Sequence, residues 1–204
     1  MRILYLITKS EAGGAQTHIW QLSNYLQHNS HQVAVMALPG GWLGKELQRA
    51  GIKFYPNPFL ANSFNPFRGI LAIKEIKKTV GDFRPDLISC HSTAAGFWTR
   101  MGIRNKVPTI FTAHGWGFAG GTPFFRKYPI ALAEKLASQF CEKIICVSDY
   151  DKKLALNYGI ANSLKIVTIH NGVEIQGDIS DKELSIPLKI VFVGRFVPQK
   201  IGRA

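Results

Sequence analysis

Short apolar runs alternate with longer segments of helical periodicity along most of the chain. The apolar runs predict buried strands at residues 2–7, 32–37, 52–55, 86–91, 108–113, 143–147 and 164–169. Helical spacing of apolar positions predicts helices over residues 16–28, 67–80, 94–104 and 124–140, and a further helix that opens at Ser148. Helical crossovers between successive strands imply an α/β fold, a Rossmann-like parallel sheet with helices on both faces.

The same pattern predicts the extent of the domains and the strand side chains of the core. We expect a Rossmann-like domain over residues 1–173, a polar linker over residues 174–187 and the first strand of a second domain within residues 188–204. The strand residues that we expect to be buried are Ile3, Leu4, Val33, Val35, Leu87, Ile88, Ile110, Ile144, Ile145, Ile166 and Val167.

The charge balance indicates an anionic partner. Lys and Arg number 25 against 13 Asp and Glu, which gives a formal net charge of +12. Such an excess suits nucleic acid, a phosphate-bearing ligand or an anionic membrane surface. The chain has neither a helix-turn-helix pattern nor an RNA-type aromatic motif, so nucleic acid is disfavoured. Hydrophobic residues make up 46% of the chain, which excludes global disorder.

The cysteine pattern and the length of the apolar runs indicate the cellular compartment of the protein. The three cysteines lie in apolar surroundings without C-x-x-C spacing, which favours buried thiols over a disulfide framework or a zinc site. No apolar stretch approaches the ~20 residues that cross a bilayer, and Lys9 and Glu11 interrupt the amino-terminal run. We therefore expect a cytoplasmic chain, with peripheral contact at the inner face of the cell membrane kept as an option.

Gly13 and Gly14 lie between the first predicted strand and the first predicted helix. Glycines there either bring backbone N–H groups close to a phosphate or form a tight turn. The surrounding residues do not spell G-x-G-x-x-G, no acidic residue ends the second strand, and no G-x-x-x-x-G-K-[ST] motif occurs. A dinucleotide-dependent oxidoreductase is therefore disfavoured.

Other polar residues also follow the carboxyl ends of predicted strands, where parallel sheets bind their ligands. His114 either binds a ligand hydroxyl or phosphate or caps the next helix, and Trp116 beside it is placed to stack on a sugar or a lipid. His91 closes the fourth strand, and Ser92 or its neighbour is expected to cap the helix that follows. We expect the glycine pair, His91, His114 and Asn171 to converge on one face.

Two segments combine basic and apolar residues. One is the helix predicted over residues 67–80, which carries Lys74, Lys77 and Lys78 opposite an apolar face, and the other is the aromatic segment 118–128. Either segment suits an anionic membrane interface. The alternative for the first segment is an ordinary amphipathic helix with a solvated lysine face.

Taken together, these motifs resemble the amino-terminal half of a family 4 glycosyltransferase. The resemblance covers residues 1–200, and its motifs occur in the family's order. They are the glycine pair after the first strand, RPDLI at 84–88, HSTAAG at 91–96, FTAHGW at 111–116, IICVS at 144–148 and IHNGV at 169–173. The resemblance implies a GT-B architecture and retaining transfer of a hexose from a nucleotide-diphospho sugar to an acceptor, with no metal and no further cofactor.

The resemblance also implies roles for individual residues. His114 would be the catalytic residue beside the transferring sugar, and Arg195 and Lys200 would neutralise the leaving diphosphate. The residues that would line the cleft between acceptor and donor are Gly13, Gly14, His91, Ser92, Trp116, Asn171 and Gly172.

The sequence departs from the family pattern after Lys200. The family has a glycine next, whereas Ile201 stands here and the chain ends at Ala204. We therefore expect about half of a family member, one that holds a polysaccharide or lipid-linked acceptor and is inactive by itself. The alternative is a non-catalytic module that binds a membrane or a partner domain.

Overall fold

In the part of the chain that the structure describes, seven strands form one parallel sheet, which confirms the fold class predicted from the sequence. The computed structural model describes residues 1–61 and 64–172 of the chain. The strands are β1 (Arg2–Leu6), β2 (Gln32–Ala37), β3 (Lys53–Pro56), β4 (Leu87–His91), β5 (Thr109–Ala113), β6 (Lys143–Cys146) and β7 (Ile166–Thr168). They lie in the order β3-β2-β1-β4-β5-β6-β7, and every neighbouring pair is parallel. The order reverses between β1 and β4, the place where such sheets bind ligands.

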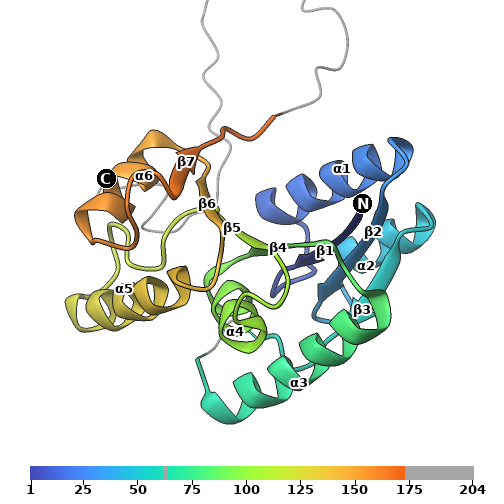
Figure 1. The fold of residues 1–204 in the computed structure, drawn as a ribbon, viewed down its shortest axis with the longest axis horizontal. Helices are drawn as coiled ribbons and strands as arrows, with labels where there is room; N and C mark the ends of the chain where they lie inside the picture. Colours follow the sequence, from blue (N-terminus) through green and yellow to red (C-terminus); the bar gives the residue numbers. More distant parts are fainter. Residues whose placement is uncertain (62–63, 173–204) are drawn as a thin grey trace, which may run out of the picture.

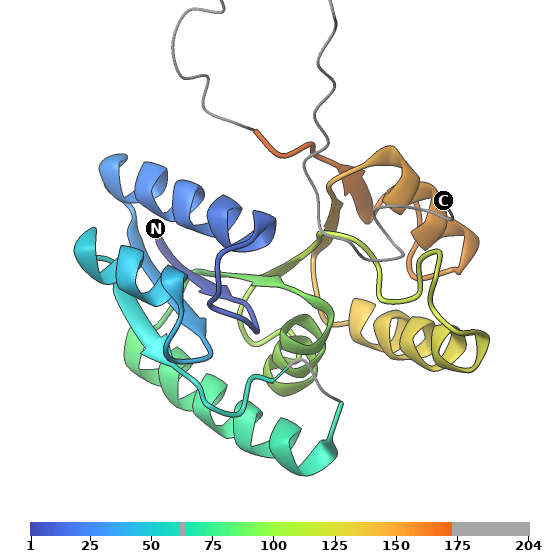
Figure 2. The same ribbon diagram turned by 180° about the vertical axis from the view of Figure 1, so that it is seen from behind.

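Six helices of the described residues cover the sheet on its two faces. They are α1 (Gly14–His28), α2 (Trp42–Arg49), α3 (Pro66–Phe83), α4 (Thr93–Ile103), α5 (Phe124–Ser138) and α6 (Asp149–Asn157). Figures 1 and 2 show α1 and α2 on one side of the sheet and α3, α4 and α5 on the other, with α6 beside β7. None of the helices in the described ranges is long and apolar enough to span a bilayer.

The core consists of two clusters, one on each face. Strand residues alternate between the faces, so Ile3 and Tyr5 pack under α1 and α2, whereas Leu4 and Leu6 pack under α3 and α4. Both faces of β1 are therefore buried, which explains why its sequence is a continuous apolar run.

Four strand residues are more exposed than the sequence predicts. Leu87, Ile110, Ile145 and Val167 are half-buried, whereas the other predicted strand residues are buried as expected. The four share the face that carries α1 and α2, as the strand register shows. These two helices cover β1 to β3, and no helix of the described residues covers β5 to β7 on that face (Figures 1 and 2).

Two helix starts differ in how well the sequence indicates them. The sequence analysis did not predict α2, because the helix has eight residues and only Leu43 and Leu47 as large buried anchors. The helix predicted to open at Ser148 is confirmed: the Asp151 backbone N–H donates to Ser148 Oγ over 3.1 Å, so Ser148 caps α6. The predicted linker and second-domain strand lie outside the described residues.

Candidate active site

Three histidines from three elements meet at the carboxyl edge of the sheet. His91 ends β4, His114 follows β5 directly, and His18 lies in the second turn of α1. Because His91 is paired with Thr112 on β5, a side chain two residues further along that strand comes beside it. The ring centroids are 5.2 Å apart for His91 and His114, 5.2 Å for His18 and His114, and 6.0 Å for His18 and His91. These three residues are called the histidine cluster below.

A hydrogen-bond chain runs from the sheet to His114. Ser89 Oγ lies 3.1 Å from His91 Nε2, and His91 Nδ1 lies 2.9 Å from His114 Nε2. Ser89 and His91 are two residues apart on one strand, so their side chains share a face. His91 is 1% exposed, whereas His114 is half-buried. A ligand at this edge therefore meets His114, and His91 lies beneath it.

The environment keeps the histidine cluster uncharged near pH 7. Burial, together with the nearby His114 and His18, holds the pKa of His91 well below its usual range. Burial and the neighbouring His18 lower the pKa of His114 to about 4, and burial lowers the pKa of His18. The three rings consequently act as hydrogen-bonding groups and not as cations.

The glycine pair opens α1 next to this cluster. α1 begins at Gly14, one turn before His18, so the helix N-terminus lies at the same edge of the sheet. Neither glycine has a left-handed backbone, and the φ of Gly13 is 178°, so no positive-φ turn requires a glycine at either position. Both are exposed, and a Cβ on Gly14 would meet no atom within 4 Å. The first backbone N–H groups of α1 and the helix dipole favour an anion at this open position.

Ser92 has a different role from the predicted cap. It occupies the N-cap position of α4 without a capping hydrogen bond from its side chain. Its Oγ instead accepts from the Thr8 backbone N–H over 3.2 Å and lies 3.1 Å from Thr8 Oγ1. Its φ is 62°, an uncommon left-handed value for a serine. Ser92 thus fastens the end of β4 to the segment after β1, beside His91.

The structure contradicts the prediction that Trp116 stacks on a ligand. Its side chain is 1% exposed, and its ring stacks on Phe118 with the centroids 5.1 Å apart. Its indole N–H donates to the Asp151 carbonyl over 2.9 Å. Gly115, with a φ of +116°, turns the chain between His114 and the buried ring. Trp116 therefore anchors the segment after His114 against α6.

The remaining predicted residues lie at or beyond the end of β7. Asn171 and Gly172 are exposed, and Gly172 lines a groove of about 530 Å³ together with His18, Tyr25 and other residues of α1. Arg195 and Lys200 lie outside the described residues. Within the described ranges, no group of three or more His, Cys, Asp or Glu side chains is arranged to hold a metal ion.

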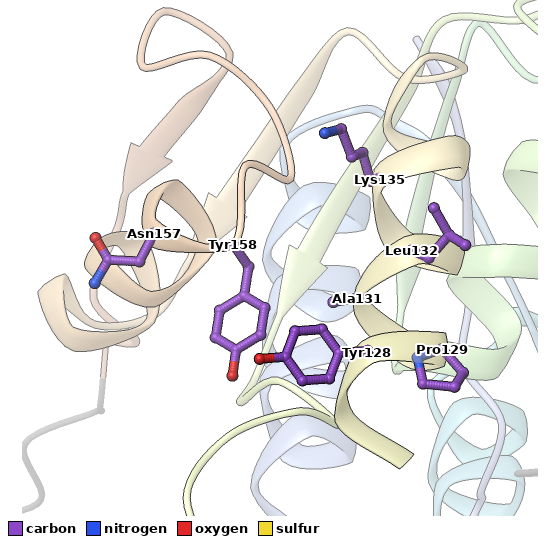
Figure 3. A pocket seen from close by; sticks show the side chains of 7 residues that line it. All are labelled: Tyr128, Pro129, Ala131, Leu132, Lys135, Asn157 and Tyr158. Carbon is purple, nitrogen blue, oxygen red and sulfur yellow. The ribbon is translucent and has the colours of Figure 1, made fainter. Parts of the chain in front are cut away.

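A second concave surface lies between α5 and α6, apart from the histidine cluster. Its volume is about 750 Å³, and it is lined by Tyr128, Pro129, Ala131, Leu132, Lys135, Asn157 and Tyr158 (Figure 3). The rings of Tyr128 and Tyr158 lie 6.2 Å apart. Aromatic and aliphatic side chains dominate this groove, and Lys135 brings a cationic end group to it.

Sequence reasoning missed two residues that shape the site. His18 lies four residues after Gly14, one helical turn from the predicted phosphate-binding end of α1. Ser89 lies two residues before His91, the spacing at which strand residues share a face. Both spacings are visible in the sequence, but neither indicates which partner the side chain meets.

The sequence and the fold both match a known family. The sequence profile described as Glycosyltransferase Family 4 matches residues 12–176, a span that holds every element from α1 to β7. This chain belongs to glycosyltransferase family 4. The resemblance carried by the glycine pair and the motifs at the strand ends is therefore confirmed.

Two curated relatives of this family 4 chain come from Escherichia coli. The O-antigen biosynthesis glycosyltransferase WbnH is 29% identical over 201 residues, which cover 96% of this chain and 55% of WbnH. The UDP-Gal:alpha-D-GlcNAc-diphosphoundecaprenol alpha-1,3-galactosyltransferase is 26% identical over 152 residues, covering 65% of this chain and 39% of that enzyme. The chain thus spans about half the length of WbnH.

Solved structures show the same fold. Anabaena HepE in complex with UDP-glucose superposes with a TM-score of 0.68 at 18% identity, over 85% of this chain and 44% of HepE. MurG of Acinetobacter baumannii superposes with a TM-score of 0.58 at 11% identity, over 85% of this chain and 47% of MurG. The described sheet and helices of the family 4 chain are therefore one half of a two-domain GT-B architecture.

Proposed function

We propose that the chain is the acceptor-binding half of a retaining hexosyltransferase that uses a nucleotide-diphospho sugar to build cell-surface glycan. One observation carries the proposal: an uncharged His114 stands at the carboxyl edge of the sheet, beside the open N-terminus of α1. A neutral imidazole suits the hydroxyl groups of a sugar, and a helix N-terminus suits a diphosphate. Both ligand groups are present in a nucleotide sugar.

The relatives favour particular substrates. WbnH is named for O-antigen biosynthesis, the galactosyltransferase is named for UDP-galactose and a diphosphoundecaprenol acceptor, and HepE was solved with UDP-glucose. We infer a uridine-diphospho hexose as the donor and a lipid-linked sugar as the acceptor. In this proposal Arg195 and Lys200 stabilise the departing diphosphate, because positive groups placed where negative charge develops lower the barrier.

A hybrid enzyme tests this proposal. Residues 1–172 are joined to the carboxyl-terminal half of WbnH, and transfer from UDP-hexoses to a lipid-diphosphate sugar is followed. We expect transfer, and we expect His114→Ala to lower kcat/KM about 100-fold, as for loss of one catalytic hydrogen-bonding group.

The control for the hybrid is His31→Ala. His31 precedes β2 at the opposite, amino edge of the sheet, so this variant should retain full transfer. A hybrid that transfers sugar equally well with and without the His114 side chain would contradict the assigned role.

A second candidate function, peripheral binding to an anionic membrane, has its own observation. α5 exposes an apolar stripe whose exposed fractions are 74% for Phe124, 75% for Phe125 and 58% for Leu132. Arg126 and Lys127 adjoin this stripe, and α5 has one acidic residue, Glu134, which is buried against Arg100. Apolar and cationic side chains without neighbouring acids suit an anionic bilayer surface.

α3 also exposes apolar and cationic side chains on the same side of the sheet, although it carries two acidic residues, Glu75 and Asp82. It exposes Phe67, Ile70 and Leu71, and its lysines at positions 74, 77 and 78 are exposed as well. In parallel α/β folds all helices begin at the carboxyl edge, so Phe67 and Phe124 lie at the edge that also carries the histidine cluster. We infer that membrane contact would place this edge close to a lipid-linked acceptor.

A further inference from the structure

The hydrogen-bond chain beneath His114 uses both ring nitrogens of His91. Nε2 of His91 meets Ser89 Oγ, and Nδ1 of His91 meets His114 Nε2. With 1% of its surface exposed, His91 has no nitrogen left for a ligand. His114 keeps one nitrogen, Nδ1, that has no hydrogen-bond partner within residues 1–61 and 64–172.

The position of one proton decides what His114 offers to a ligand. A neutral imidazole carries one N–H donor and one acceptor nitrogen. If His91 donates to His114 Nε2, then His114 carries its proton on Nδ1 and presents a donor outward. If His114 donates to His91, its outward Nδ1 is an acceptor. The hydrogen bond made by one nitrogen thus sets the state of the other.

Ser89 determines the direction in which the groups of this hydrogen-bond chain donate. Ser89 is 4% exposed, and the one hydrogen-bond partner of its hydroxyl in the described part of the chain is His91 Nε2. A buried donor without an acceptor is costly, so the Ser89 proton is placed on this bond. His91 Nε2 then accepts, which puts the His91 proton on Nδ1, where it is donated to His114 Nε2. Each of the buried protons on Ser89 and His91 in this hydrogen-bond chain has an acceptor in this arrangement.

We propose that Ser89 and His91 are positioning residues that hold His114 in the Nδ1–H tautomer, so that it donates a hydrogen bond to an oxygen of the bound ligand. This inference rests on the proposed function for the role of His114 and goes beyond it by stating which atom acts and what sets its proton. The backbone N–H groups that open α1 are donors at the same edge. The site then consists of donors, which suits the oxygen-rich surface of a sugar diphosphate.

No charged side chain in the described residues competes for this proton. The groups that face His114 and His91 are His18 from α1 and the ring of Tyr5 from β1, whose centroid lies 5.8 Å from that of His91. Burial keeps all three histidines neutral near pH 7, so the tautomer is defined at that pH.

Long-range ¹H–¹⁵N correlation spectra of the histidine-labelled chain test the proposal at pH 7. We expect the Nδ1–H pattern for His91 and His114, although Nε2–H is the usual form of a neutral histidine in water. His31 is the internal reference, because the amino-terminal ammonium group donates to its Nδ1 over 3.3 Å and leaves its proton on Nε2. An Nε2–H pattern for His114 would overturn the proposal.

Substitutions at Ser89 and His91, the buried end of the hydrogen-bond chain, test the direction of donation. Ser89→Ala removes the donor, so we expect His114 to shift toward Nε2–H, and Ser89→Thr, which keeps a hydroxyl, should restore the Nδ1–H pattern. His91→Asn is a second variant, since an amide N–H near the position of Nδ1 can still donate to His114 and keep its proton on Nδ1. If the Ser89→Ala variant folds and His114 keeps the Nδ1–H pattern in it, the proposal would also be overturned.

These spectra do not depend on sugar transfer, so the two proposals can fail separately. In the hybrid enzyme, Ser89→Ala should lower kcat/KM about threefold to tenfold, the effect of one hydrogen bond. If the tautomers are as expected but His114→Ala leaves transfer intact, the catalytic role proposed for His114 fails and the inference about the hydrogen-bond chain stands. If His114→Ala abolishes transfer while His114 of the unsubstituted chain shows the Nε2–H pattern, the role of His114 stands and the inference about the hydrogen-bond chain fails.

Discussion

The absence of a side chain at Gly96 sets the distance between a helix and a strand. It lies in α4, and a Cβ at this position would come within 2.5 Å of a ring carbon of Phe111 on β5. The guanidinium of Arg100, one turn later, lies 4.1 Å from the centroid of the same ring. α4 therefore packs directly on β5, the strand that His114 follows, and any larger residue at position 96 pushes the helix and the strand apart.

A pair of glycine substitutions tests this packing. Gly96→Ala should lower the free energy of unfolding by about 1–3 kcal/mol, because the added methyl overpacks a buried contact. Gly81→Ala in α3 is the matched control, since its Cβ would meet no atom within 4 Å. It should raise the free energy of unfolding by roughly 0.5–1 kcal/mol through higher helix propensity. Urea denaturation measures both, and changes of the same sign would contradict the packing argument.

At the scale of elements, small residues also bring α3 and α4 together. A Cβ on Gly69 would lie 2.3 Å from the ring of Trp98, and one on Gly102 would lie 2.9 Å from a side-chain carbon of Ile73. The close contact buries one face of α3 and leaves the opposite face exposed, where Phe67 is 79% exposed. Apolar side chains on that outer face therefore do not contribute to the core, and they are available to a membrane.

Vesicle binding tests the surface formed by α3 and α5. We expect the chain to sediment with phosphatidylglycerol vesicles and not with phosphatidylcholine vesicles, and we expect added salt to weaken binding. The double variant Phe124→Ser and Phe125→Ser should reduce binding about tenfold or more, because two apolar anchors are lost.

The matched control for membrane binding is Tyr25→Ser on α1. Tyr25 is 65% exposed but lies on the other face of the sheet. Equal loss of binding in the control and the double variant would contradict a membrane surface confined to α3 and α5.

At the scale of the whole molecule, the proposed function requires the described sheet to supply one side of a transfer site. The histidine cluster and the N-terminus of α1 are held by β1, β4 and β5, all central strands. Transfer also needs groups that grip the nucleotide and the developing charge, since catalysis depends on binding the transition state more tightly than the substrate. Related glycosyltransferases are about twice as long as this chain.

We therefore expect the 204-residue chain by itself to catalyse no measurable transfer or hydrolysis of UDP-glucose or UDP-galactose. Donor binding should be weak and sensitive to salt, as for attraction to a surface with an excess of positive charge. Release of UDP, followed by chromatography, measures both reactions. Turnover by the isolated chain that disappears in His114→Ala would contradict this expectation.

The sequence by itself determined the sheet and the edge at which the site lies. A strand of a parallel sheet is a local apolar run bounded by polar residues, so all seven strands could be found without any knowledge of their neighbours. The placement of His91 and His114 at strand ends follows in the same way, because carboxyl ends of parallel strands meet at one edge. The two-turn helix α2 was not predicted, because two buried leucines are too few to show a helical period.

Only the tertiary structure decided how the side chains at this edge pair. His91 and His114 are 23 residues apart, and their contact depends on β4 and β5 being neighbours in register. Trp116 turns into the core and not toward a ligand because Gly115 redirects the chain and the Asp151 carbonyl accepts its N–H. Local patterns report burial and period, whereas partners distant in sequence are selected by strand order and helix packing, which no local pattern contains.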